Sequence, residues 1–322
     1  GAVSFSSFLL LTPFYTMSEK GEKISGVLSL DRLGAKGMFL GMLVAFLAAE
    51  IYCWATKKGW QIKMPDSVPP AVTKSFAALI PAVLTLSIFL FVNAGLTGFF
   101  DANLHDIIYK VIQTPLVGLG SSIWATLVAI FFVQFLWFFG LHGQILVNSV
   151  MDPIWNTLML DNLEAYQAGK HLPHIISKSF METFTVGLGG SGMTLAVVII
   201  MAFILKKKMY KDVGRLALGA GLFNVNEPVI FGLPIVLNAT ILIPWVLAPI
   251  VVTAFNYIVM AVGIVPAPTG VAVPWTVPVF FSGMLATNSI LGGVLQLVDM
   301  VIVGFIWYPF LRMLDKQPDS VL

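Results

Sequence analysis

The chain has 322 residues, of which 58% are hydrophobic and 11% charged, with a formal net charge of +2. Soluble globular domains carry roughly 25% charged residues, so this composition excludes an ordinary soluble domain and indicates large surfaces that face lipid. The near balance of charge gives no indication of a nucleic-acid partner, and the lone cysteine, Cys53, excludes an internal disulfide and a cysteine-based metal site.

Apolar runs dominate the chain from its first residues. The sequence starts at Gly1 without an initiator Met or a signal-peptide pattern, so we expect residues 1–15 to be the end of a span in a protein whose first part is missing. A helix needs roughly 20 apolar residues to cross a bilayer. Further runs of that kind cover 37–55, 75–99, 118–140, 183–205, 239–263 and 290–311. With the less regular segments below, they predict about seven to nine crossings.

Lysines cluster in two short loops, beginning near Lys57 and Lys206, and the positive-inside rule places both loops in the cytoplasm. The loop over 100–117 lies between them and should face outside. The apolar run 118–140, which follows this loop, should end in the cytoplasm again. An even number of crossings must therefore separate residue 140 from Lys206. We therefore expect the polar segment 142–160, which is helical in period, to cross within the interior of the bundle.

Aromatic residues mark the ends of several apolar runs. Trp137 and Trp307 have this position, which is typical of side chains that anchor a helix at the membrane interface. Trp245, by contrast, lies inside an apolar run.

Two segments are apolar but interrupted by proline and glycine, residues 216–238 and 264–289, and each is followed by a full-length apolar run. Interrupted segments paired in this way indicate the binding site of a transporter. They predict two re-entrant hairpins whose tips lie at membrane depth, where irregular backbone is tolerated only against protein or water.

Glu227 is the most informative polar residue, because it lies in the sequence NVNEP within the first interrupted segment. A carboxylate at membrane depth costs several kcal/mol unless it is paired, hydrated or protonated. Asn224 and Asn226 add amide donors and acceptors beside it. The functional interpretation is a polar cluster that binds a hydroxylated substrate, and the alternative is a structural carboxylate that caps a half-helix.

Other polar and aromatic residues extend this candidate site. His142 and Gln144, with Asn148 nearby, begin the polar crossing, although a lone histidine is often structural. Trp275 lies at the tip of the second interrupted segment, where its face suits the apolar C–H face of a sugar ring, but tryptophan is also a common packing residue. Asn288 is a weaker candidate.

Two further acids, Glu182 and Asp299, lie in apolar surroundings, and we favour a structural role for Asp299. The glycines of 187–192 are expected to allow close helix packing rather than to hold a phosphate. The sequence has no Walker pattern, dinucleotide fingerprint or zinc ligand set, so we expect neither a cofactor nor a metal.

These residues resemble a known family. The strongest segment is GLFNVNEPVIFGLPIVLN over 221–238, supported by segments 62–76, 141–144 and 274–278. Together they resemble the membrane-embedded IIC components of the bacterial phosphotransferase system, in the lactose/cellobiose/diacetylchitobiose branch. The diacetylchitobiose and cellobiose types are the most similar, and the resemblance covers essentially the whole chain.

The resemblance implies a function that composition cannot supply. Members of this family are homodimers in the bacterial inner (plasma) membrane that bind an external disaccharide. A separate IIB protein, phosphorylated on its own cysteine, transfers the phosphoryl group to the sugar 6-hydroxyl at the cytoplasmic face. The family's glutamate and histidine correspond to Glu227 and His142, which would lie beside that hydroxyl, and its site tryptophan to Trp275.

The predicted fold is an all-α, polytopic integral membrane helix bundle with two re-entrant hairpins. Residues 1–117 would form an incomplete set of N-terminal membrane helices that belongs to the dimer interface, and 118–322 the substrate-binding membrane domain. Family members have further N-terminal helices, so we expect this sequence to be part of a longer chain, and because it shows no IIB-like domain we expect the phosphoryl donor to be a separate protein.

Two alternatives from other classes remain at this stage. A proton- or sodium-coupled secondary transporter of a small polar solute would use the same interrupted segments, with Glu227 as the coupled group, and would stop when the membrane potential collapses. A structural or receptor protein would show no turnover, and the two polar interrupted segments argue against it.

Overall fold

The computed structural model describes residues 1–17, 22–65, 67–100, 102–233 and 235–316. The chain forms two compact units, Gly1–Leu116 and Val117–Leu322, and each is described here by itself. Within the described residues, four helices are long and apolar enough to cross a membrane, or five if the bent pair over Leu104–Gly120 and Ile123–Phe138 counts as one span. This architecture confirms the predicted all-α membrane bundle.

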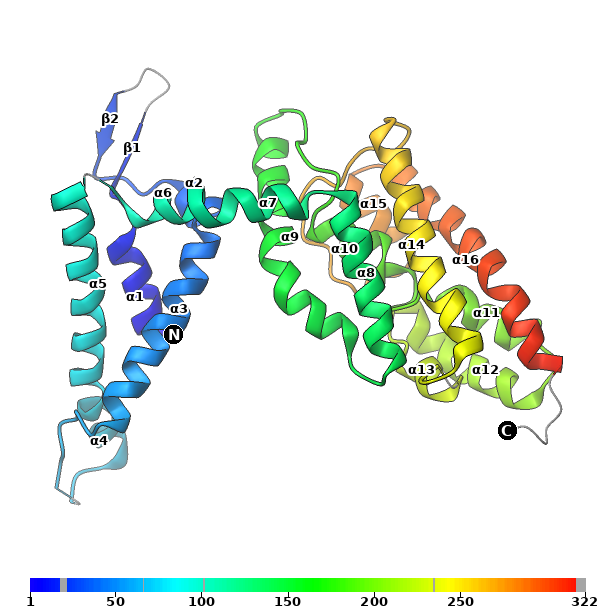
Figure 1. The fold of residues 1–322 in the computed structure, drawn as a ribbon, viewed down its shortest axis with the longest axis horizontal. Coiled ribbons are helices and arrows are strands. Elements are labelled where there is room, and N and C mark those ends of the chain that lie inside the picture. Colours follow the sequence, from blue (N-terminus) through cyan, green and yellow to red (C-terminus); the bar gives the residue numbers. More distant parts are fainter. Residues whose placement is uncertain (18–21, 66, 101, 234, 317–322) are drawn as a thin grey trace. The chain divides into compact units, whose positions relative to one another are not determined.

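The first unit is built on three helices that lie side by side (Figure 1). Its elements are α1 Ala2–Leu11, β1 Tyr15–Met17, β2 Lys23–Ser25, α2 Leu30–Leu33, η1 Ala35–Gly37, α3 Met38–Lys57, α4 Pro70–Ala77, α5 Leu79–Phe100, α6 Leu104–Ile108, η2 Tyr109–Gln113 and α7 Thr114–Gly120, which runs past the unit's end. Helices α1, α3 and α5 share a small core around Leu11, Leu40, Val44 and Phe89. The strands β1 and β2 pair antiparallel, with Tyr15 opposite Ser25.

Residues 104–117 are helical where the sequence predicted a loop. Helix α6 begins after Asn103, whose side chain accepts a hydrogen bond from the Asp106 main-chain nitrogen at 2.9 Å, and α7 follows η2 directly. An asparagine at this position supplies a partner for a main-chain donor that a helix start leaves unpaired. The prediction of a loop is therefore wrong for the described residues, and Asp101 lies outside them.

The second unit carries the interrupted segments. Its elements are α8 Ile123–Phe138, α9 Gly143–Gln167, α10 Lys178–Phe184, η3 Val186–Leu188, α11 Leu195–Phe203, α12 Lys208–Leu222, α13 Glu227–Gly232, α14 Ala239–Ala261, α15 Phe281–Thr287 and α16 Ile290–Lys316. Helix α9 covers the polar crossing predicted over 142–160. Helices α14 and α16 pack together (Figure 1), and there the buried Asp299 accepts a hydrogen bond from Asn256 Nδ2 at 2.9 Å.

The apolar run 183–205 is not one helix, which corrects the sequence prediction. Helix α10 ends at Phe184, and the chain turns through η3 and a glycine-rich loop before α11 begins at Leu195. Gly189, Gly190 and Gly192 have φ values of +100°, +80° and +78°. Glycine adopts this left-handed region at low cost, whereas other residues do so rarely. Apolar composition alone did not reveal the break.

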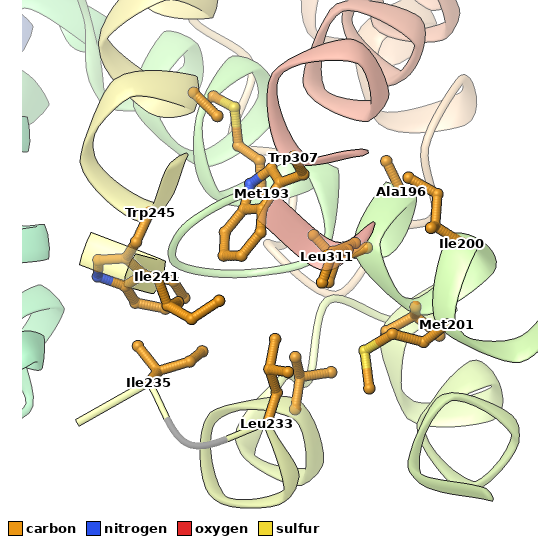
Figure 2. Packing of buried hydrophobic residues seen from close by; sticks show 14 of the residues in the cluster. Met193, Ala196, Ile200, Met201, Leu233, Ile235, Ile241, Trp245, Trp307 and Leu311 are labelled. Carbon is orange, nitrogen blue, oxygen red and sulfur yellow. The ribbon is translucent and has the colours of Figure 1, made fainter. Parts of the chain in front are cut away.

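The glycine loop packs into a hydrophobic core of the second unit. Figure 2 shows Trp245, Trp307, Met193 and Leu311 around its centre. The rings of Trp245 and Trp307 meet edge to face with centroids 6.4 Å apart, and Trp245 Nε1 donates to the Gln134 carbonyl at 3.1 Å. Trp307 is fully buried, so its interpretation as an interfacial anchor is wrong.

We expect Gly192→Ala to destabilise the second unit. A Cβ at this position would clash with the Trp245 ring, and the positive φ adds strain for any residue with a side chain. Overpacking and the left-handed backbone together should cost roughly 2–5 kcal/mol. The thermal midpoint in detergent, followed by size-exclusion chromatography, measures the loss.

Gly219→Ala is the matched control for this substitution. Gly219 lies inside α12, has open space around its Cβ position and has no positive φ. Alanine should leave stability unchanged or raise it slightly, because alanine is the better helix former. Equal midpoints for the two variants would contradict the packing described for Gly192.

The two interrupted segments meet through Asn224. In 216–238, α12 ends at Leu222 and a turn leads into α13, while in 264–289 the chain stays non-helical until α15. Asn224 Nδ2 donates to the carbonyl oxygens of Trp275 at 2.6 Å and Val277 at 3.1 Å. That the tips of the two interrupted segments lie at membrane depth stays a prediction. Pro234 of the first segment lies outside the described residues.

Candidate functional site

A cavity of about 330 Å³ lies within the second unit, where both interrupted segments meet the start of α9. Its lining residues are Trp137, His142, Gln144, Ile145, Asn148, Glu182, Val186, Gly190, Ser191, Asn224, Asn226, Glu227 and Trp275. The structure thus brings together all but one of the predicted site residues. The exception is Asn288, which donates to the Tyr166 hydroxyl at 2.8 Å and does not line this cavity.

Glu227 stands at the first position of α13, directly after the turn at the end of α12. A carboxylate is favourable there because the main-chain N–H groups of a first helical turn lack partners within the helix. Pro228 follows at a position where its missing N–H costs nothing. Glu227 is exposed to the cavity, and within the described residues its carboxylate forms no hydrogen bond or ion pair, so its oxygens are available to a ligand.

His142 is the N-cap of α9 and presents one ring nitrogen to the helix. Its Nδ1 accepts a hydrogen bond from the Ile145 main-chain nitrogen at 3.3 Å. An accepting Nδ1 places the proton of the neutral ring on Nε2, which becomes a donor. The ring also contacts Trp137, with centroids 4.4 Å apart, which limits its rotation. His142 can therefore donate to an oxygen in the cavity.

Asn224 and Asn226 bind the protein backbone, which changes their predicted role. In addition to its bonds to the second segment, Asn224 accepts from the Gly189 main-chain nitrogen at 2.7 Å. Asn226 Nδ2 donates to the Ser191 carbonyl at 2.6 Å. The two asparagines are only 2% and 6% exposed. They hold the glycine loop and the two segment tips in place, and the predicted contact with substrate stays a prediction.

The remaining predicted residues form the polar and aromatic walls. Ser191 Oγ donates to Gln144 Oε1 at 3.2 Å, which fixes the glutamine amide. Trp275 is 45% exposed and lines the cavity, so a sugar ring could lie against its face.

Sequence reasoning missed six cavity residues, of which three have polar or aromatic side chains. Trp137 was interpreted as an interfacial anchor but is buried against His142, and Ser191 and Glu182 were not assigned to the site. Glu182 had a signal, because Lys178 precedes it by one helical turn in otherwise apolar sequence. Trp137 and Ser191 had none, since tryptophan at the end of an apolar run and serine in a glycine-rich turn are both common.

Comparisons with known proteins agree with this geometry. The family model described as "Phosphotransferase system, EIIC" matches residues 1–249. The chain is 62% identical over 316 residues to the PTS system oligo-beta-mannoside-specific EIIC component of Bacillus subtilis (strain 168), a match that covers 98% of this chain and 72% of the relative. It is 41% identical over 325 residues to the PTS system cellobiose-specific EIIC component of Geobacillus stearothermophilus, with coverage of 98% and 72%.

A solved structure shows the same fold. The crystal structure of the transporter ChbC, the IIC component from the N,N'-diacetylchitobiose-specific phosphotransferase system, superposes with a TM-score of 0.92 at 40% sequence identity. The match covers 98% of this chain and 74% of that chain. Family model, relatives and fold all point the same way: the chain belongs to the EIIC family of the phosphotransferase system, whose members are multi-pass, sugar-specific membrane permeases.

Proposed function

We propose that this chain binds a β-linked disaccharide, of the β-mannoside or cellobiose class, in the cavity between His142, Glu227 and Trp275. The supporting observation is that these three residues come from separate segments and line one cavity of about 330 Å³. Relatives at 62% and 41% identity are named for oligo-beta-mannosides and cellobiose. Both sugars combine apolar C–H faces with a rim of hydroxyls, which suits an aromatic wall and polar groups.

Phosphoryl transfer to the sugar would use the exposed side chains of Glu227 and His142. The 6-hydroxyl oxygen attacks the phosphorus of the phosphocysteine on a IIB protein, the P–S bond breaks and the cysteine leaves as a thiolate. Glu227 accepts the hydroxyl proton as the new O–P bond forms, and His142 Nε2–H orients the same oxygen. Phosphoryl transfer depends mainly on positioning and electrostatics. Two well-placed side chains of the membrane protein can therefore be enough to assist the reaction.

The partners of this reaction are part of the proposal. Phosphorylated IIB would approach from the cytoplasmic face, and the first unit would contribute to a homodimer. Crosslinking of single-cysteine variants on the exposed faces of α3 and α5 in native membranes tests the dimer. Products only of monomer mass at every position would contradict it.

Uptake by membrane vesicles tests the function. Vesicles that contain the protein should convert labelled mannobiose or cellobiose to intravesicular sugar phosphate when phosphorylated IIB is enclosed. Uptake should fall to background without IIB and persist when the membrane potential is collapsed. Uptake of unmodified sugar that needs the potential but not IIB would instead support a proton- or sodium-coupled transporter.

A further inference from the structure

Lys178 joins two helices beside the cavity through a compact ion-pair cluster. Its Nζ lies 2.7 Å from Asp152 Oδ1 on α9 and 2.7 Å from Glu182 Oε1, one turn along α10. Asn148 presents its amide oxygen to the same Nζ at 3.2 Å when its nitrogen donates to the Gln144 main-chain oxygen. In that orientation of the Asn148 amide, the ammonium group has an oxygen partner for each of its three N–H donors.

The cluster reaches the cavity through Glu182 and Asn148. Both line the cavity, whereas Lys178 and Asp152 do not. The side chains of Lys178 and Glu182 are 16% and 18% exposed, so water screens this pair weakly. Ordinary surface ion pairs fix side chains poorly, but a half-buried pair with additional hydrogen bonds holds a carboxylate in one orientation.

The cavity needs a cation close to it. It is lined by two carboxylates, Glu182 and Glu227, and none of its described lining residues is a lysine or arginine. Like charges in a low-dielectric cavity repel, so a nearby cation stabilises an ionised carboxylate there. Lys178 meets this need from just behind the cavity wall and leaves the cavity free for substrate.

We propose that Lys178 is a positioning residue that holds the Glu182 side chain in one orientation, aimed into the cavity, where Glu182 accepts a hydrogen bond from a sugar hydroxyl and helps to select the sugar. The inference rests on the proposed function, because it assigns Glu182 and Lys178 to the same sugar site. Glu227 keeps the chemical role, so the Lys178–Glu182 pair affects which sugar binds and how tightly, rather than the rate of phosphoryl transfer from a saturated site.

Variants of this pair should therefore lose sugar affinity while their rate of phosphoryl transfer at saturating sugar stays nearly unchanged. Lys178→Gln should weaken disaccharide binding by about 10- to 100-fold, the range for loss of a charge-assisted hydrogen bond, and Glu182→Gln should do the same. The transfer rate at saturating sugar should change by less than about threefold in both. Lys178→Arg keeps the charge and should restore most of the affinity.

A double-mutant cycle isolates the positioning role. If Lys178 acts through Glu182, then Lys178→Gln should have little further effect once Glu182→Gln is present. Lys170→Gln is the matched control, because Lys170 is exposed and lies beyond the end of α9. A purely structural Lys178 would instead lower the thermal midpoint and both kinetic parameters together.

Each outcome decides the proposal. Normal sugar binding by Glu182→Gln overturns it even if Lys178→Gln fails to fold, because Lys178 then has no ligand group to position. Additive losses in the cycle overturn it as well. Failure of the wild-type protein to form sugar phosphate with phosphorylated IIB would instead overturn the proposed function, so the two failures are distinguishable.

Discussion

Glu227→Gln should lower the rate of phosphoryl transfer at saturating sugar by about 10²- to 10⁴-fold, while sugar binding weakens far less. Gln preserves the shape of the side chain and can still bond to a hydroxyl, but it cannot accept the proton. General-base assistance is worth about 3–5 kcal/mol, whereas one charged hydrogen bond contributes about 1.5–3 kcal/mol to binding. Equilibrium dialysis measures binding, and sugar phosphate formed with excess phosphorylated IIB measures transfer.

Asp212→Asn is the control for removal of a negative charge. Asp212 is exposed on α12 and lies outside the cavity lining, so this variant should bind and transfer normally. If Glu227→Gln bound sugar poorly but transferred at the normal rate once saturated, Glu227 would be a binding residue only. If both properties were normal, the carboxylate would serve only to cap α13.

Asn224→Ala should weaken sugar binding strongly and also destabilise the second unit. The substitution removes the amide that bonds to the carbonyls of Trp275 and Val277, and it leaves the Gly189 N–H with the Val186 carbonyl as its remaining acceptor. Each buried polar group left unpaired costs about 1–3 kcal/mol, and alanine also fits poorly at φ +64°. We expect a loss of roughly 3–6 kcal/mol in stability and of more than about 100-fold in affinity.

Asn288→Ala is a close chemical match for this change. Asn288 also has a left-handed backbone, with φ +48°, but makes one exposed hydrogen bond to Tyr166 and does not line the cavity. The Asn288→Ala change should cost about 1–2 kcal/mol, mainly from the left-handed backbone, and leave affinity unchanged. Thermal midpoints and dialysis compare the two variants, and an equally mild effect of Asn224→Ala would contradict its role as the link between the segments.

The sequence indicated the candidate site because charge stands out in apolar surroundings. Glu227 was conspicuous for that reason, and His142 and Trp275 because each borders an irregular or polar stretch. That these residues share a cavity depended on long-range contacts that a single sequence does not record. The resemblance to a known family predicted that these residues lie together, and in the structure all three line one cavity.

The role of Asn224 was harder to predict than its location. Its partners lie 35, 51 and 53 residues away, so nothing local distinguishes an amide that binds backbone from one that binds sugar. The break in 183–205 was missed for a related reason. Hydropathy records apolar character but not the positive φ values of Gly189 and Gly190, which turn the chain between α10 and α11.

The measurement that most directly tests the central claim is a cycle between Glu227 and the sugar 6-hydroxyl. It needs four dissociation constants: wild type and Glu227→Gln, each with the disaccharide and with its analogue that lacks the reacting 6-hydroxyl. A direct contact predicts that loss of the hydroxyl weakens wild-type binding about five- to tenfold more than it weakens binding to the variant. Equal losses in the two proteins would show that Glu227 does not face the 6-hydroxyl and would contradict the proposed site.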